Sequence, residues 1–108
     1  MPETHLVVLC TVPDAATGER IAHALVGERL AACANLVPGL VSIYRWQGKV
    51  ERAAEQLLVI KTVGARFAAL EDRIRALHPY SVPEIVALPV TAGSRAYLDW
   101  LTDNTGPA

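Results

Sequence analysis

The chain of 108 residues lacks an excess of charge of either sign, since 10 lysines and arginines stand against 11 aspartates and glutamates. Binding to phosphate backbones requires a basic surface, so this balance argues against nucleic acid as a partner. Aromatic residues are scarce at 6%, whereas hydrophobic residues reach 52%. That composition excludes a disordered chain and predicts a single domain over residues 1–108, with more apolar surface than a small monomer buries.

Long apolar segments are also missing. The longest run without a charged residue, 30–44, is too short to cross a bilayer and contains Pro38 and Gly39. No basic cluster precedes the first apolar stretch, so we expect neither a secretory signal nor a membrane segment. The expected location is the cytoplasm.

Cysteine is rare and catalytic motifs are absent. Cys10 and Cys33 form no CxxC pair, and without a secretory signal we expect both to be free thiols. The sequence has no GxGxxG, no P-loop and no Ser/His/Asp signature. Binding is therefore favoured over catalysis, and we predict that the protein is not an enzyme.

Hydrophobic periodicity divides the chain into seven elements. Four apolar or alternating segments are predicted as strands: 5–12, 33–46, 50–63 and 84–91. Three segments with helical spacing are predicted as helices: 15–30, 65–78 and 94–103. Asp14 should cap the first helix, Pro79 should end the second, Pro38-Gly39 should form a bulge or kink, and 47–49 should form a hairpin turn.

The order β-α-β-β-α-β-α defines an α+β fold of the ferredoxin-like, split βαβ type. Such a fold has an antiparallel four-stranded sheet with both long helices on one face, here followed by a short C-terminal helix. The hairpin strand is apolar at every position from Leu57 to Ile60, so its two faces are both apolar. We expect the face without helices to be buried by oligomerisation.

The most specific segment is His78-Pro79-Tyr80-Ser81-Val82-Pro83-Glu84-Ile85. Its two prolines stiffen the connection between a helix and a strand, so that His78, Tyr80 and Glu84 are held in place for binding.

This segment and five others have the order and spacing of one known family: Val8–Thr11, Leu30–Leu36, Ser42–Lys49, Lys61-Thr62 and Tyr97–Leu101. Over nearly its whole length the chain resembles the CutA family of divalent-cation tolerance proteins. The resemblance implies a cytoplasmic homotrimer of ferredoxin-like subunits, paired through their strands, with a role in the response to copper or other divalent metals. The resemblance implies no particular reaction, because none is firmly assigned to that family.

The copper ligands proposed in that family fall on Cys10 and on two adjacent histidines, of which this chain keeps His78 and replaces the other by Leu77. Glu84 could add an oxygen ligand. The resemblance thus implies a weak site for copper or another divalent cation at Cys10, His78 and Glu84. Two plainer roles stay open: Cys10 as a core side chain, which we favour, and His78 as the cap of a helix C-terminus.

Two hypotheses also stay open for the role of the aromatic residues. Tyr44, Trp46 and Tyr80 could line a ligand cleft in which Lys61 and Glu84 fix a polar group. Alternatively they anchor a subunit interface, a common role of Tyr and Trp that we favour. The leading hypothesis is a non-enzymatic homotrimer that binds divalent cations at subunit clefts. The alternative is a trimeric small-molecule sensor or scaffold resembling the PII signalling proteins.

Overall fold

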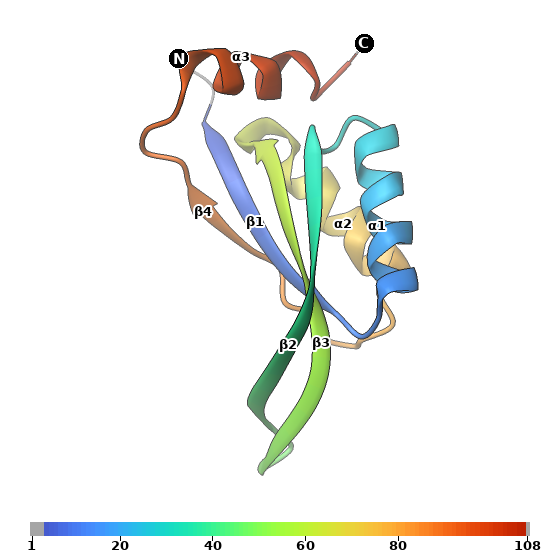
Figure 1. Cartoon of the computed structure of the whole chain (residues 1–108). Helices are drawn as coiled ribbons and strands as arrows, with labels where there is room; N and C mark the ends of the chain where they lie inside the picture. Colours follow the sequence, from blue (N-terminus) through green and yellow to red (C-terminus); the bar gives the residue numbers. More distant parts are fainter. Residues whose placement is uncertain (1–3, 108) are drawn as a thin grey trace.

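The computed structural model describes residues 4–107, which form one antiparallel sheet with the strand order β2-β3-β1-β4. The strands are β1 (His5–Val12), β2 (Cys33–Trp46), β3 (Lys49–Val63) and β4 (Val86–Pro89). The helices are α1 (Ala15–Gly27), α2 (Phe67–Leu77) and α3 (Arg95–Asp103), with a 3-10 turn η1 (Gly64–Arg66) before α2. This is the predicted α+β fold. Figure 1 shows that β2 and β3 continue beyond the other strands as a long twisted arm.

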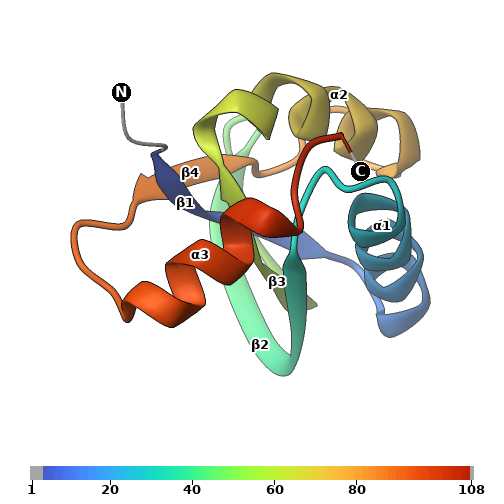
Figure 2. The same cartoon turned by 90° about the horizontal axis from the view of Figure 1, so that it is seen from above.

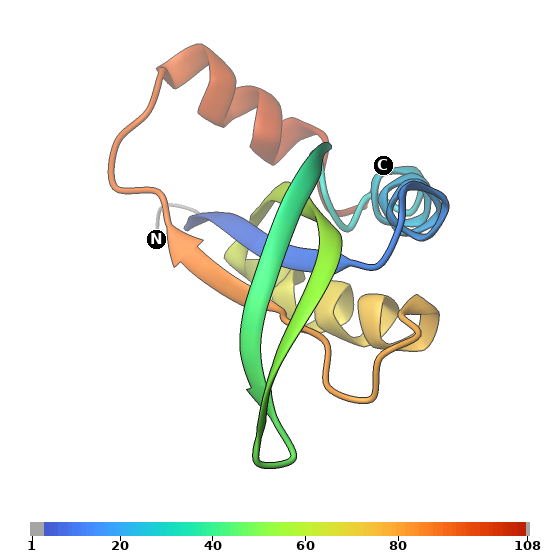
Figure 3. The same cartoon turned by 60° about the horizontal axis from the view of Figure 1, so that its bottom comes forward.

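The core lies between the sheet and helices α1 and α2, which are side by side on one of its faces (Figures 1 and 3). Its largest fully buried side chains come from both layers: Val8, Val12, Ile21, Leu25, Leu58, Ile60, Leu70 and Ile74. Figure 2 shows α3 crossing one end of the sheet, apart from the other two helices. Within residues 4–107 no helix is long and apolar enough to span a membrane.

Helix α1 begins as predicted and ends earlier. Asp14 caps it, with its carboxylate accepting a hydrogen bond from the backbone N–H of Thr17 (2.8 Å). The prediction of a helix to residue 30 was wrong, because Arg29 adopts a left-handed conformation (φ 60°). The N–H groups of Arg29 and Leu30 then bond to the carbonyls of Val26 and Leu25, the Schellman arrangement that closes a helix.

The arm of β2 and β3 is a two-residue hairpin. Gln47 and Gly48 both have positive φ (51° and 81°), which is the type I′ geometry that matches the twist of paired strands. The strand after the turn consequently begins at Lys49, one residue before its predicted start. The predicted interruption at Pro38-Gly39 is confirmed as a shift of register between Val37 and Leu40.

The last strand is shorter than predicted, since only Val86–Pro89 pairs with β1 and not all of 84–91. Extending the register by two residues would set Glu84 opposite Thr11. The Thr11 carbonyl instead accepts a hydrogen bond from the ring of His78 (Nε2 to O, 2.8 Å). Residues 80–84 therefore leave the sheet as a loop, after a helix that ends at Leu77, before Pro79.

Candidate functional site

A cleft of about 500 Å³ opens where the arm meets the loop 80–84. Its strand residues are Thr11, Ser42, Tyr44, Trp46 and Glu55, and its loop residues are Tyr80, Ser81, Val82, Pro83 and Glu84. Thr11 lies between Cys10 and Val12, which are buried in the core, so its side chain is on the face of the sheet away from α1 and α2. The cleft thus belongs to the face that these helices leave uncovered.

Alternation along β2 explains the aromatic wall. Ser42, Tyr44 and Trp46 are spaced by two residues, so their side chains share one face of the strand. Tyr80 reaches the same cleft from the loop after α2. The three aromatic side chains are between 37% and 44% exposed, so their rings remain open to a ligand or to another subunit. Four of the five residues predicted for a cleft meet here: these three and Glu84.

Glu55 is a cleft residue that the sequence did not reveal. Its side chain is only 8% exposed, and its Oε2 accepts a short hydrogen bond from the hydroxyl of Tyr80 (2.6 Å). Burial raises the pKa of Tyr80, and the hydrogen bond and charge of Glu55 raise it further. The phenol therefore stays protonated and acts as a donor to the carboxylate. The only signal in the sequence was the position of this glutamate between two alanines and the apolar run that begins at Leu57, and Glu51 and Arg52 on the same strand make that signal weak.

The carboxylates of the cleft have no countercharge. Among the described residues that line it there is no lysine, arginine or histidine. Within residues 4–107 the structure contains one ion pair, between Arg73 and Glu28 (3.0 Å), and neither residue lines the cleft. A buried carboxylate is normally paired with a cation, so the cleft has an unbalanced negative charge.

Cys10 lies beneath the cleft and is completely buried in the core. Burial raises the pKa of its thiol to about 12, and the charges of Glu84 and Glu55 raise it as well. The thiolate, which is the form that binds metals, is thus strongly disfavoured. The predicted free state of Cys10 and Cys33 is confirmed.

His78 connects the end of α2 to the neighbouring strand and loop. It is 7% exposed, its Nε2 donates to the carbonyl of Thr11 (2.8 Å), and its Nδ1 accepts from the backbone N–H of Tyr80 (3.2 Å). Both ring nitrogens are engaged, and these partners define the tautomer that is protonated at Nε2. The ring holds the loop to β1 and does not cap the carbonyls of its own helix.

The predicted ligands Cys10, His78 and Glu84 do not form a metal centre in this arrangement. Within residues 4–107 no group of three or more His, Cys, Asp or Glu side chains is placed to hold an ion. A copper or zinc ion bound by Cys10 and His78 would have to displace the proton of a buried thiol and a hydrogen bond of the His78 ring. The oxygens of Glu55 and Glu84 are the anionic groups that line the open space of the cleft.

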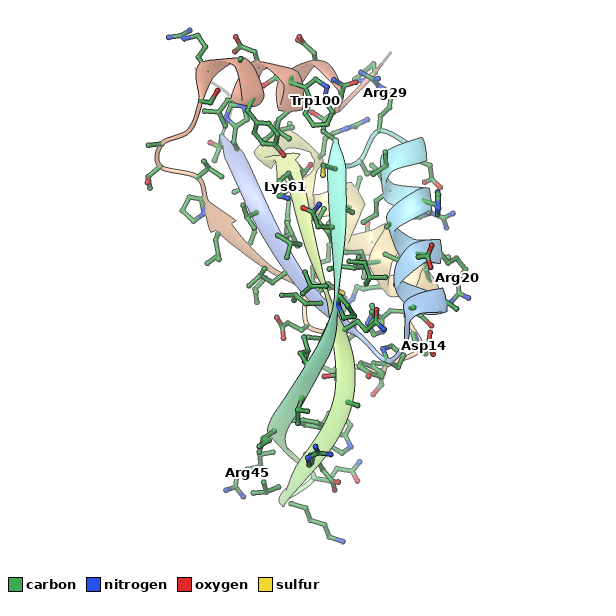
Figure 4. The ribbon with its side chains drawn as sticks, viewed as in Figure 1. Asp14, Arg20, Arg29, Arg45, Lys61 and Trp100 are labelled. Carbon is green, nitrogen blue, oxygen red and sulfur yellow. The ribbon has the colours of Figure 1, made fainter. Side chains whose placement is uncertain are left out.

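Lys61 is the fifth residue predicted for the cleft, and the structure does not bring it there. It follows Glu55 by six residues on β3, a separation of roughly 20 Å at about 3.3 Å per residue. Its ammonium group donates to the side-chain oxygen of Asn35. Figure 4 shows Lys61 toward α3, at the opposite end of the sheet from Arg45 on the arm.

Large apolar side chains are exposed on the arm, in the loop 80–84 and on the edge strand β4. Ile43, Val50 and Val82 are 65–72% exposed, and Val41, Val86 and Leu88 are about half exposed. Exposed apolar residues clustered on strands are typical of surfaces that another protein covers.

The described residues thus define a ferredoxin-like α+β domain with an acidic, aromatic cleft and a long arm that carries exposed apolar side chains. Residues 6–104 match the sequence model of the CutA1 divalent ion tolerance protein family. The chain belongs to this family.

Individual relatives support the same assignment. The chain is 61% identical over 100 residues to the divalent-cation tolerance protein CutA of Thermus thermophilus, covering 93% of this chain and 97% of that protein. The solved structure of the Thermus thermophilus protein superposes with a TM-score of 0.93 at 60% identity, covering 94% of this chain and 99% of that one. A chloroplastic CutA of Arabidopsis thaliana is 47% identical over 93% of this chain, which spans 55% of that protein.

Proposed function

We propose that the protein is a non-enzymatic, homotrimeric divalent-cation response protein that binds cations weakly at clefts between subunits. The observation that carries the proposal is the pair of carboxylates, Glu55 and Glu84, that line the cleft without a basic partner. The family's description as a divalent ion tolerance protein agrees with this charge. We place the protein in the cytoplasm on the sequence expectation alone, since the plant relative is named as chloroplastic.

The trimer is supported by exposed apolar side chains on both faces of the sheet. Val86 and Leu88 on β4 pair with Leu9 and Val7 on the face that the helices leave uncovered, whereas Ile43 and Val50 lie on the opposite face of the arm, and all four would be exposed in a monomer. Closed symmetric assembly buries such side chains and removes free strand edges. Because Tyr44 and Trp46 lie on the same arm, a neighbouring subunit would complete the cleft, and both sequence-based roles of these aromatics would hold together.

Metal affinity should be modest. Two carboxylates supply only part of a coordination shell, so water or a neighbouring subunit must provide the remaining ligands. Oxygen donors favour hard ions such as Mn²⁺ over Cu²⁺ held by sulfur. We propose that Glu84 is a direct ligand, and that Cys10 and His78 act mainly by shaping the cleft, because their ligation requires removing a proton from a buried thiol and freeing a bonded ring nitrogen.

The second candidate function is a trimeric small-molecule sensor of the PII-like type. The size of the cleft favours it, since about 500 Å³ with aromatic walls lies in the range of organic ligand sites. The carboxylates weigh against nucleotides and other anionic ligands.

The test combines light scattering after gel filtration with calorimetric titration of Mn²⁺, Zn²⁺ and Cu²⁺. We expect a trimer at micromolar concentration and metal binding that weakens in Glu84→Gln. The matched control is Glu71→Gln, since Glu71 on α2 does not line the cleft. A stable monomer would refute the assembly. Equal metal binding by both variants and the wild type would remove Glu84 from the site.

A further inference from the structure

The walls of the cleft are aromatic to a degree that a metal ion does not require. Tyr44, Trp46 and Tyr80 line it together with Val82 and Pro83. Aromatic faces attract organic cations through their π electrons, and apolar walls favour a ligand with a carbon body. A divalent ion is held by oxygen ligands and waters and gains little from such walls.

The size of the cleft points the same way. Its volume is about 500 Å³. An ion with six waters occupies on the order of 180 Å³, taking about 30 Å³ for each water. The space is therefore larger than a hydrated ion fills, and it suits a molecule of several non-hydrogen atoms.

The charge of the cleft selects the sign of the ligand. Glu55 is buried and Glu84 lies at the exposed rim, and no described lining residue carries a positive charge. The Tyr80 hydroxyl donates to one oxygen of Glu55 (2.6 Å), and within the described part of the chain, residues 4–107, no group donates to the other. Hydroxyls of Thr11 and Ser42 line the same space and can accept hydrogen bonds. This lining disfavours anions, whereas a group with several N–H donors would find several acceptors.

We propose that the cleft binds a small organic cation: a primary alkylammonium group on an apolar body of a few carbons. The ammonium group lies toward Glu55 and Glu84, and the carbon body lies against Trp46 and the two tyrosines. The inference uses the cleft of the proposed function and does not require that a metal binds there.

The test is a fluorescence titration with n-butylammonium chloride, at constant ionic strength maintained with NaCl. The chain has two tryptophans, and Trp100 lies on α3, away from the arm (Figure 4). The Trp100→Phe variant therefore reports on Trp46 alone. For so small a ligand we expect saturation in the millimolar range. n-Butanol and butyrate have a similar carbon body without the positive charge, and neither should bind measurably.

Substitutions then locate the site. Glu84→Gln should raise the dissociation constant about fivefold, the loss expected for one partly exposed charge contact. Glu71→Gln should leave it unchanged. Tetramethylammonium carries the charge without N–H donors and should bind more weakly than n-butylammonium.

Three results would overturn the inference: no saturation with n-butylammonium, equal binding of n-butanol, or no effect of Glu84→Gln. Metal binding by the same Trp100→Phe protein is measured separately by calorimetry. Loss of metal binding with retained amine binding would refute the proposed function and leave this inference standing, and the reverse result would do the opposite.

Discussion

The hydrogen bond between Tyr80 and Glu55 provides the sharpest test of how the cleft is built. Tyr80→Phe removes the hydroxyl that donates to Glu55 Oε2 at 2.6 Å and leaves the ring in place. The carboxylate is only 8% exposed, so water cannot fully replace the lost donor. A hydrogen bond to a charged group is worth about 1.5–3 kcal/mol, and we expect a loss of about 2 kcal/mol in the free energy of unfolding.

The assay is urea unfolding at pH 7 with all variants at one protein concentration, because assembly makes stability depend on concentration. Tyr44→Phe is the matched control: Tyr44 lines the same cleft, and its hydroxyl makes no hydrogen bond to the residues that the structure describes, 4–107. The double variant Tyr80→Phe/Glu55→Gln measures the coupling of the pair. If Tyr80→Phe and Tyr44→Phe lose the same stability, or the coupling is near zero, the hydrogen bond does not hold the loop.

Three further predictions concern the core, the helix and the arm. Burial raises the pKa of Cys10 from 9.0 to about 12, so the folded state holds the thiol proton more tightly than the unfolded state does. The resulting contribution to the free energy of unfolding is fully present below pH 9, and it falls at up to about 1.4 kcal/mol per pH unit as the pH rises toward 12. Urea midpoints from pH 8 to 11 should fall less steeply for Cys10→Ala, and parallel slopes would contradict the burial argument. Gly18→Ala should be less stabilising than Gly27→Ala by about 1 kcal/mol, because the added carbon would lie 2.7 Å from a methyl group of Leu36, which can move, and 3.1 Å from a methyl group of the buried Val12, whereas at Gly27 it meets open space and the gain in helix propensity is kept; thermal melts that rank the two alike would be inconsistent with this packing. Trp46→Ala should weaken the proposed trimer by about 2 kcal/mol, measured by light scattering on dilution, and an unchanged oligomeric state would restrict Trp46 to the cleft.

The parts of the fold that the sequence predicted well are those fixed by local chemistry. Asp14 caps its helix through a bond to a residue three positions away, and Pro79 ends a helix through its own ring. The end of α1 was missed because Arg29, and not glycine, takes the left-handed position. The usual signal for that geometry is a glycine, and the sequence places one at the last helical residue instead.

The sequence predicted only part of the cleft, because some of its residues are brought together only by the folded chain. Tyr44 and Trp46 share a face through simple alternation, which periodicity reveals. Glu55 and Tyr80 meet across 25 positions, and only the folded chain brings them together. Lys61 illustrates the opposite error: it lies in one of the family-like motifs, but its distance along β3 places it by Asn35.

The contacts of His78 and Tyr80 explain why so short a loop can position a binding residue. The His78 ring ties the start of the loop to β1 through Thr11, and the Tyr80 hydroxyl ties it to β3 through Glu55. Pro79 restricts the backbone after His78, and Pro83 restricts it after Tyr80. The loop therefore has few alternative conformations to lose when a ligand binds. Glu84 is thereby placed at the cleft partly by the His78 ring, which does not line the cleft. Weaker ligand binding in His78→Ala would therefore be consistent with a positioning role of His78 as well as with ligation. Glu84→Gln leaves the hydrogen bonds of His78 and Tyr80 intact, so weaker binding in this variant would indicate a direct contact between Glu84 and the ligand.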